Sequence, residues 1–127
     1  MEKEFCTYEQ ALAIKELGFD ELCFGYYIET GEWVPASYSI QGTVYPSNSD
    51  LLPEWTSAPL KQQVLKFFRE KYNITQNIAK DGSLAKEGIW AYTIVADMIY
   101  FDDGFKTYEA AEDVCIDKLI ELTKKRK

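Results

Sequence analysis

The first part of the chain carries apolar residues at helical spacing. They recur every three residues and would lie on one face of an α-helix; they are Tyr8, Ala11, Ile14 and Leu17. Thr7 precedes them, and its hydroxyl can accept a hydrogen bond from a first-turn amide, while Gln10 can complete a capping box. Gly18 follows and can adopt the left-handed conformation that ends many helices. The pattern predicts a helix over residues 7–17.

From residue 22 the apolar positions alternate instead with a period of two, which is typical of a β-strand. One strand is expected over residues 22–28 and a second over residues 34–40, with a turn at residues 29–32 between them. The two segments predict a hairpin. Pro35 has no N–H to donate to a neighbouring strand, so we expect the second strand to lie at a sheet edge.

Residues 42–57 combine turn-forming Gly, Pro, Ser and Asn with a few large apolar side chains. We expect a long loop here. Ser57 is the predicted N-cap of the next helix, which extends to residue 72. Its apolar face recurs at i, i+4, i+7, i+8 and i+12; the residues are Leu60, Val64, Phe67, Phe68 and Tyr72.

The second half of the chain predicts further strands and a last helix. Residues 74–79 can form a short strand, with a turn at residues 81–82, and residues 88–95 are apolar on both faces, as in the middle of a covered sheet. Residues 98–101 either extend that strand or turn back at residues 96–97. Residues 102–104 are expected to end the sheet. Thr107 opens the last helix, whose apolar stripe is Ala111, Val114, Cys115, Leu119 and Leu122.

These elements predict an α+β fold. The chain has 127 residues, a length typical of one domain. We therefore expect a single domain over residues 1–127, in the order α-β-β-α-β-β-(β)-α. It would contain a mostly antiparallel sheet of four or five strands covered by three helices, with the long loop at residues 42–57 and a basic tail at residues 124–127.

The charge distribution argues against direct binding of nucleic acid. The net charge is −7, and four of the cations lie in the basic tail. Without them residues 1–123 carry about −11. Such an acidic body repels phosphate, and phosphate contacts supply most nucleic-acid affinity. The tail is explained by the favourable interaction of cations with a helix C-terminus.

Residue types that are missing or scarce narrow the chemistry further. There is no histidine, which excludes Ser-His-Asp and Cys-His pairs and histidine-containing zinc sites. Cys6, Cys23 and Cys115 show no CxxC spacing, and their odd number fits a reduced cytoplasmic setting. The N-terminus is charged from the start and does not resemble a secretory signal. The longest apolar stretch, residues 89–101, is too short to cross a bilayer as a helix.

Seven segments of the chain form a further set of motifs: FCTYEQAL (5–12), GFDE (18–21), CFGYY (23–27), APLxQQ (58–63), FFREKY (67–72), TYExA (107–111) and KLI (118–120). In these segments the sequence resembles small uncharacterised proteins carried by phages, prophages and gut Bacteroidales. Together the segments span most of the chain. The resemblance implies a cytoplasmic product of a mobile element, but it brings no assigned activity and no assigned binding residues.

Carboxylates are the most plentiful candidates for catalysis. Asp97, Asp102 and Asp103 bracket the predicted central strand and could hold Mg²⁺ or divide into an acid and a base. The same residues are equally explained as turn residues, and no phosphate-binding loop accompanies them. Cys6 lies just before a helix N-cap, a position that can make a thiol reactive, but no histidine is present to act as its base. We therefore predict no catalytic residue, no metal site and no cofactor.

Aromatic residues make up 15% of the chain, and we expect most of them to build the core and those left outside it to be contact points. Tyr and Trp are enriched at protein interaction sites because they combine a large contact area with a polar group. The candidate binding residues are Leu51, Leu52, Trp55, Trp33 and Tyr45. In the alternative interpretation, Leu52 and Trp55 fold back as a lid over the protein's own sheet.

The sequence thus favours a small, non-catalytic cytoplasmic protein that acts as an adaptor or modulator. Its expected partner is another protein or a second copy of itself, with no direct binding of nucleic acid or membrane. One alternative is an acidic mimic of nucleic acid that inhibits a DNA-binding enzyme. Others are a carboxylate or Mg²⁺-dependent enzyme built on Asp97, Asp102 and Asp103, and an aromatic-lined site for a small molecule or sugar.

Overall fold

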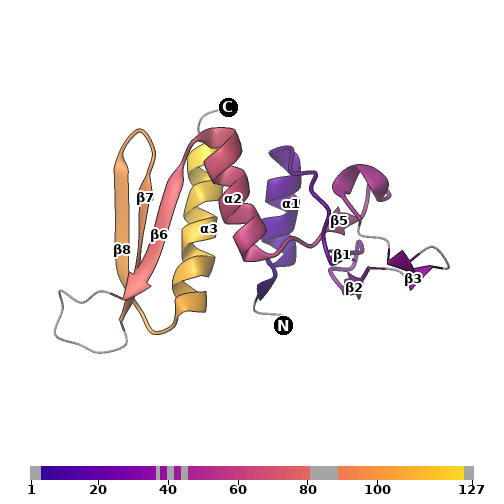
Figure 1. Ribbon diagram of the computed structural model, residues 1–127, viewed down its shortest axis with the longest axis horizontal. Coiled ribbons are helices and arrows are strands. Elements are labelled where there is room, and N and C mark those ends of the chain that lie inside the picture. The colour runs from indigo at the N-terminus through magenta and orange to yellow at the C-terminus, as the bar shows by residue number, and fades with distance from the viewer. Residues whose placement is uncertain (1–3, 37, 40–41, 44–45, 81–88, 125–127) are drawn as a thin grey trace. The chain divides into compact units, whose positions relative to one another are not determined.

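The computed structural model describes residues 4–36, 38–39, 42–43, 46–80 and 89–124 (Figure 1). The α+β prediction is confirmed, with three α-helices and antiparallel strands. The contacts divide the chain into two compact units, Met1–Gln63 and Val64–Lys127, which are described separately below. A single domain over residues 1–127 stays a prediction.

The first unit contains helix α1 (Tyr8–Glu16) and an antiparallel sheet in the order β2-β1-β5. The strands are β1 (Gly25–Tyr27), β2 (Trp33–Pro35) and β5 (Thr56–Ser57). A separate antiparallel pair is formed by β3 (Tyr38–Ser39) and β4 (Gly42–Thr43), and a short 3₁₀ helix, η2, covers Asn48–Asp50. Pro35 lies in edge strand β2, as predicted, because its missing N–H removes nothing from the β1–β2 ladder there.

The predicted start of α1 is confirmed in detail. Thr7 is the N-cap, and its hydroxyl accepts a hydrogen bond from the Gln10 amide at 3.2 Å. The Gln10 side-chain oxygen in turn accepts from the Thr7 amide at 2.9 Å, which completes the capping box. Gly18, with φ of +95°, lies just beyond the helix end. A buried cluster packs below α1, and its members are Phe5, Ala11, Tyr27 and Ala58.

The second unit contains a three-stranded antiparallel sheet in the order β6-β7-β8 and helix α3 (Tyr108–Lys124). The strands are β6 (Thr75–Lys80), β7 (Trp90–Val95) and β8 (Ile99–Phe105), and α3 contacts all three (Figure 1). The central position predicted for residues 88–95 is confirmed for β7. Lys124 ends α3, while residues 125–127 of the basic tail and the predicted turn at residues 81–82 lie outside the described residues.

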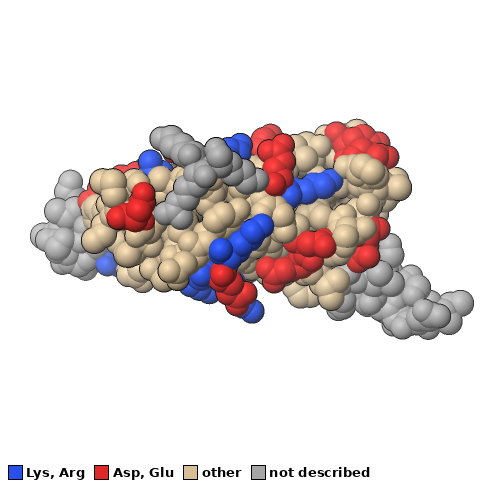
Figure 2. Space-filling model, turned by 90° about the horizontal axis from the view of Figure 1, so that it is seen from above, with Lys and Arg blue, Asp and Glu red and all other residues tan. Residues whose placement is uncertain are grey.

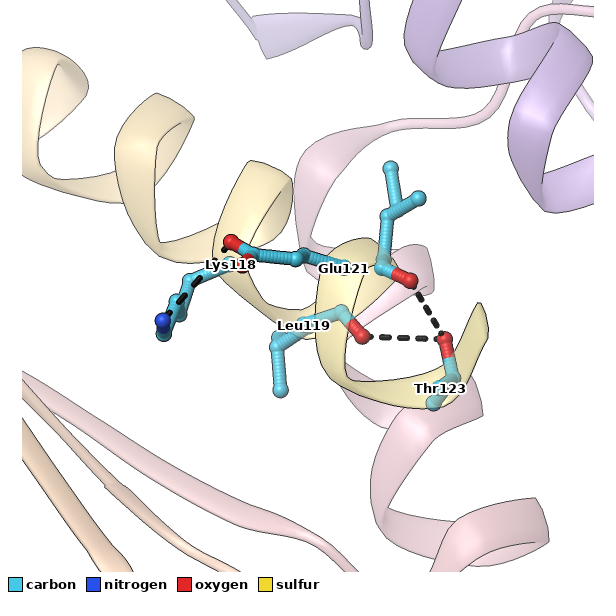
Figure 3. A network of polar contacts seen from close by, with 5 residues as sticks. Lys118, Leu119, Glu121 and Thr123 are labelled. Atoms are coloured by element: carbon cyan, nitrogen blue, oxygen red, sulfur yellow. Dashed lines mark hydrogen bonds and ion pairs between the residues drawn. The ribbon is translucent and has the colours of Figure 1, made fainter. Parts of the chain in front are cut away.

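Threonine side chains make hydrogen bonds to the backbone at both ends of helix α3. Thr107 accepts a hydrogen bond from the Ala110 amide at 3.1 Å, so it is the predicted N-cap. Near the C-terminus the buried Thr123 hydroxyl lies 2.9 Å from the Leu119 carbonyl oxygen and 3.0 Å from that of Ile120 (Figure 3). Most of the predicted stripe is buried, but Val114 is exposed at 38%, so its place in the stripe was wrong.

The prediction of one sheet with four or five strands was wrong, because the structure has two three-stranded antiparallel sheets. Strand β1 has a neighbour on both sides, β2 and β5, and β5 comes from the segment that we expected to be loop. Strands β6, β7 and β8 follow one another along the chain and pair in that order. Within the described residues, each sheet is therefore completed by strands of its own unit.

The start of the middle helix also differs from the prediction. Helix α2 covers Lys61–Tyr72 and spans the division between the two units. Ser57 does not cap it, since Thr56 and Ser57 pair with Tyr27 and Tyr26 in the first sheet. Near the helix start, the Leu60 amide donates to the Gln63 side-chain oxygen at 2.9 Å. Thr56 and Ser57 have side chains that could cap a helix, but they form strand β5 instead.

Residues 102–104 do not end the second sheet, in contrast to our expectation. They lie inside β8, where Trp90 pairs with Phe105 and Tyr92 with Asp102, so β8 holds one extra residue. This irregularity is a β-bulge, and Gly104 adopts φ of +89° within it. The glycine that indicated a turn therefore supports a bulge within a continuing strand.

Candidate functional site

The sequence allowed residues 98–101 either to extend the preceding strand or to turn back at residues 96–97, and the β7–β8 hairpin shows that they turn back. The chain turns back after β7, and the Ala96 amide donates to the Met98 carbonyl at 3.0 Å. A carboxylate oxygen of Asp97 accepts from the Met98 amide at 3.0 Å and stabilises the turn without a glycine. Residues 99–101 therefore form the start of β8 and pair with β7.

One face of this hairpin is buried by α3. Tyr92 and Ile94 of β7 are buried, and Tyr100 of β8 pairs with Ile94 on the same face. The ammonium group of Lys118 on α3 lies 5.3 Å from the centre of the Tyr100 ring. Burial raises the pKa of Tyr92, and the nearby Asp102 carboxylate adds to the shift. This face belongs to the core of the second unit.

The opposite face carries large apolar side chains that remain in contact with solvent. Val95 pairs with Ile99, and Thr93 pairs with Phe101, so these residues share the face turned away from α3. The exposed fractions are 45% for Val95, 71% for Ile99 and 58% for Phe101. We call Val95, Ile99 and Phe101 the outer apolar surface. Met98, in the adjoining turn, is also exposed, at 64%.

The outer apolar surface has no charged residue between Ile99 and Phe101, and Asp103 follows Phe101 in the alternation of β8 and borders it. On β6 and β7 the neighbouring positions of the same face are small or uncharged; they are Thr75, Asn77, Ala79, Ala91 and Thr93. Adjoining exposed apolar side chains without charges are a common feature of interaction sites, because isolated apolar residues rather than clusters are normal on a soluble protein. This arrangement makes the outer apolar surface the best candidate for a functional site.

Trp55, the leading candidate from the sequence, lies against its own unit. Its ring stacks on Tyr26 of β1, with the ring centres 5.2 Å apart and the planes 21° apart. Its indole N–H donates to the Glu29 carboxylate at 2.8 Å. The Lys15 ammonium donates to the backbone carbonyls of Pro53 and Trp55, both at 2.8 Å. These contacts agree with the alternative interpretation of the sequence, in which Trp55 folds back over the protein's own sheet.

The other candidates from the sequence differ from Trp55 in exposure, although the Trp55 amide donates to the Leu52 carbonyl at 2.9 Å. Leu52 is exposed at 49% and Leu51 is half-buried. Trp33 packs its ring against Phe5, with the ring centres 5.3 Å apart, and is still partly exposed. Tyr45 lies outside the described residues. Leu52 and Trp33 therefore remain accessible, whereas Trp55 already makes specific contacts within the first unit.

The three candidate aspartates do not come together. Asp97 lies in the β7–β8 turn, while Asp102 lies five residues further along, next to the bulge. Five residues of extended strand span roughly 16 Å. The carboxylates of Asp97 and Asp102 each accept a hydrogen bond from the next residue's amide at 3.0 Å. Within the part of the chain that the structure describes, no group of three metal-binding side chains is found.

The three thiols are all buried, and the exposed fraction of Cys6, which lies just before the N-cap of α1, is 0%. Burial raises the pKa of Cys23 to about 11 and that of Cys115 to about 12. A neutral thiol is a poor nucleophile and a poor metal ligand. Cys23 and Cys115 therefore behave as small apolar core residues.

Charges on the visible surface are mixed. Figure 2 shows acidic side chains in separate groups, with Lys and Arg and uncharged residues between them. Two exposed ion pairs lie along helices, Lys66 with Glu70 at 3.8 Å and Lys118 with Glu121 at 3.6 Å (Figure 3).

Comparisons with protein-family models, with curated proteins and with solved structures give no match. Among the described helices, none is both long and apolar enough to pass through a membrane.

Sequence reasoning missed the outer apolar surface although its residues were in view. Residues 89–101 form the longest apolar stretch, and we explained their two-sided apolar pattern by a sheet covered on both faces. The signal that could have found the site is the alternation of Ile99 and Phe101 with Tyr100 and Asp102. In a hairpin that alternation places two large apolar side chains next to Val95 on one face.

Proposed function

We propose that this chain is a non-catalytic interaction protein that acts as an adaptor or modulator by binding another protein through the outer apolar surface. The observation that carries the proposal is the exposure of Val95, Ile99 and Phe101 on adjoining positions of one sheet face. Contact with water is unfavourable for such side chains, and covering them is worth about 25 cal/mol per Å². A partner that covers this face gains that free energy.

A cytoplasmic product of a mobile element, as implied by the resemblance, fits this kind of role. Such a protein would change the behaviour of a larger protein by occupying part of its surface. The chemistry expected at the interface is apolar in the centre and polar at the rim, because Asp97 in the turn and Asp103 of β8 border the outer apolar surface. The partner should therefore present an apolar groove or strand edge.

The test is an affinity purification from the cell in which the gene is expressed, followed by titration with the purified partner. Phe101→Lys should abolish recovery of the partner, because it places a charge in the centre of the buried contact. Leu22→Lys is the matched control, since Leu22 is exposed at 61% and lies in the first unit. Equal recovery with wild type and Phe101→Lys would contradict the proposal.

The candidate residues of the first unit give a second, independent proposal for the contact. Leu52 and Trp33 are accessible, and in this second proposal the partner contacts them instead of the outer apolar surface. Trp55→Ala tests the loop at residues 51–55 in the same purification. A loss of partner with Trp55→Ala but not with Phe101→Lys would move the proposed interface to this loop.

A further inference from the structure

Strand β8 is an edge strand within the described sheet, because it pairs with β7 and the order ends there. An edge strand presents unpaired amide and carbonyl groups, and proteins usually protect such edges with proline, lysine or a short strand length. β8 has seven residues and contains neither proline nor lysine. The bulge at Gly104 disturbs its far end, which leaves residues 99–102 as a regular, open stretch.

The opposite edge of the same sheet differs in composition. Strand β6 is mostly polar and ends in Lys80. Its outward-facing side chains are small or polar at Thr75 and Asn77, whereas those of β8 are Ile99 and Phe101. Apolar side chains at an open edge favour pairing with another strand, since pairing covers both the backbone groups and the side chains. We therefore expect another strand to pair with the β8 edge more readily than with the β6 edge.

The net charge of the chain restricts the surfaces through which two copies could meet. Two copies of a protein with a net charge of −7 repel each other wherever acidic surfaces meet. Residues 99–101 carry no charge, and neither do Val95 and Thr93 beside them on the same sheet. A contact through this stretch lets two copies meet without placing carboxylates in its centre.

The alternation of residues in β8 makes the strand complementary to itself. In a symmetric antiparallel pair centred on Tyr100, Ile99 of each copy lies opposite Phe101 of the other. Both of these cross-strand pairs join an aromatic and a β-branched side chain, a combination that stabilises antiparallel sheets. Asp102 lies opposite Met98 in this register, so no two carboxylates face each other within residues 98–102, and the two Asp97–Asp103 pairs fall just beyond the ends of this stretch.

We propose that the β8 edge is a homodimer interface, in which two copies of this chain pair through residues 98–102 and form a continuous six-stranded sheet. The inference rests on the proposed function, because it identifies a second copy as a partner of the same outer apolar surface. The dimer buries Ile99 and Phe101 of both copies against each other. Its two-fold axis passes beside Tyr100.

The proposal is tested on the full chain by light scattering after size-exclusion chromatography and by sedimentation over a concentration series. Wild type should be a dimer, and Ile99→Lys should weaken self-association roughly tenfold or more. Leu22→Lys, the matched control, should leave it unchanged. Circular dichroism checks that each variant is folded. A wild type that stays monomeric up to about 1 mM would overturn the inference.

The register is tested with introduced cysteines. Tyr100→Cys should form a disulfide between copies rapidly, since residues directly opposite each other have Cβ atoms about 4.5–5.5 Å apart. Thr75→Cys on the β6 edge is the control and should react slowly. The native cysteines are buried and do not compete. Equal rates for Tyr100→Cys and Thr75→Cys would overturn the edge pairing.

The two proposals fail in different ways. If wild type is monomeric but Phe101→Lys loses a heterologous partner, self-association is wrong and the interaction function stands. If the β8 edge dimerises the protein but no other partner depends on Phe101, the homodimer stands and the adaptor function is wrong.

Discussion

At the scale of single residues, a Cβ atom added to Gly25 would meet both a side chain and the backbone of its neighbours. A Cβ atom added to Gly25 would lie 2.7 Å from the Trp33 ring and 2.7 Å from the Val34 carbonyl oxygen. The second contact is with backbone and cannot be relieved by a side-chain rotation. We expect Gly25→Ala to destabilise the protein by about 2 kcal/mol, measured by urea unfolding.

Gly104→Ala is the control for that substitution. Gly104 has φ of +89° and no atom within 4 Å of the added Cβ. The expected cost is only the strain of a left-handed residue, about 1 kcal/mol. If Gly104→Ala costs more than Gly25→Ala, the packing of Trp33 over Gly25 is not the tight contact described here.

The buried thiols give the stability of the protein a defined dependence on alkaline pH. The pKa of Cys23 is raised from 9.0 to about 11 and that of Cys115 from 9.0 to about 12. At a pH between 9.0 and the raised pKa of each thiol, the unfolded chain has released the thiol proton and the folded protein still holds it. The free energy of unfolding should therefore be unaffected below pH 9 and fall above it, by up to about 1.4 kcal/mol per pH unit for each thiol.

The measurement is urea unfolding at a series of pH values from neutral to about pH 11. The double variant Cys23→Ala, Cys115→Ala should show a smaller fall than wild type over the same range. An identical pH dependence for both proteins would contradict the role of the thiols. Native wild type should also resist alkylation at neutral pH, because all three thiols are buried.

At the scale of the elements, the two terminal helices α1 and α3 begin with the same sequence pattern, but a full capping box is described only for α1. Both begin with the pattern Phe-x-Thr-Tyr-Glu-x-Ala, and both threonines are N-caps. In α1 Gln10 completes the capping box, whereas α3 has Ala110 at the corresponding position. We expect Thr7→Ala to cost about 1–2 kcal/mol and Thr107→Ala about 0.5–1 kcal/mol in unfolding free energy.

Gln10→Ala separates the two halves of the capping box. It removes the bond to the Thr7 amide and leaves the Thr7 hydroxyl bond to the Gln10 amide intact. The cost of Thr7→Ala should then be smaller in the Gln10→Ala background than in wild type. Equal costs in both backgrounds would show that the two bonds act independently.

These elements also show which features a sequence can predict. Helix starts at Thr7 and Thr107 and the edge position of Pro35 depend on local chemistry, so they were predicted correctly. The pairing of Thr56 and Ser57 with β1 depends on residues about 30 positions away, which no local pattern reveals. The outer apolar surface was missed for the same reason, since exposure depends on which sheet face α3 covers.

At the scale of the whole molecule, net charge sets how association should respond to salt. Two copies at −7 each repel at low ionic strength, and this repulsion opposes a contact that is itself apolar. Screening extends over about 10 Å at 0.1 M salt and shrinks to about 3 Å at 1 M. Raising the NaCl concentration from about 0.05 to 0.5 M should therefore tighten self-association several-fold.

A nucleic-acid mimic would show the opposite salt dependence in its complex with a DNA-binding enzyme. A mimic binds a basic groove through its carboxylates, so its complex weakens as salt rises. Sedimentation of wild type and Leu22→Lys across the salt series follows the self-association directly. The added lysine lowers the magnitude of the net charge of each copy, so Leu22→Lys should respond slightly less to salt. Self-association that weakens with rising salt would contradict an apolar β8 contact and favour pairing between charged surfaces.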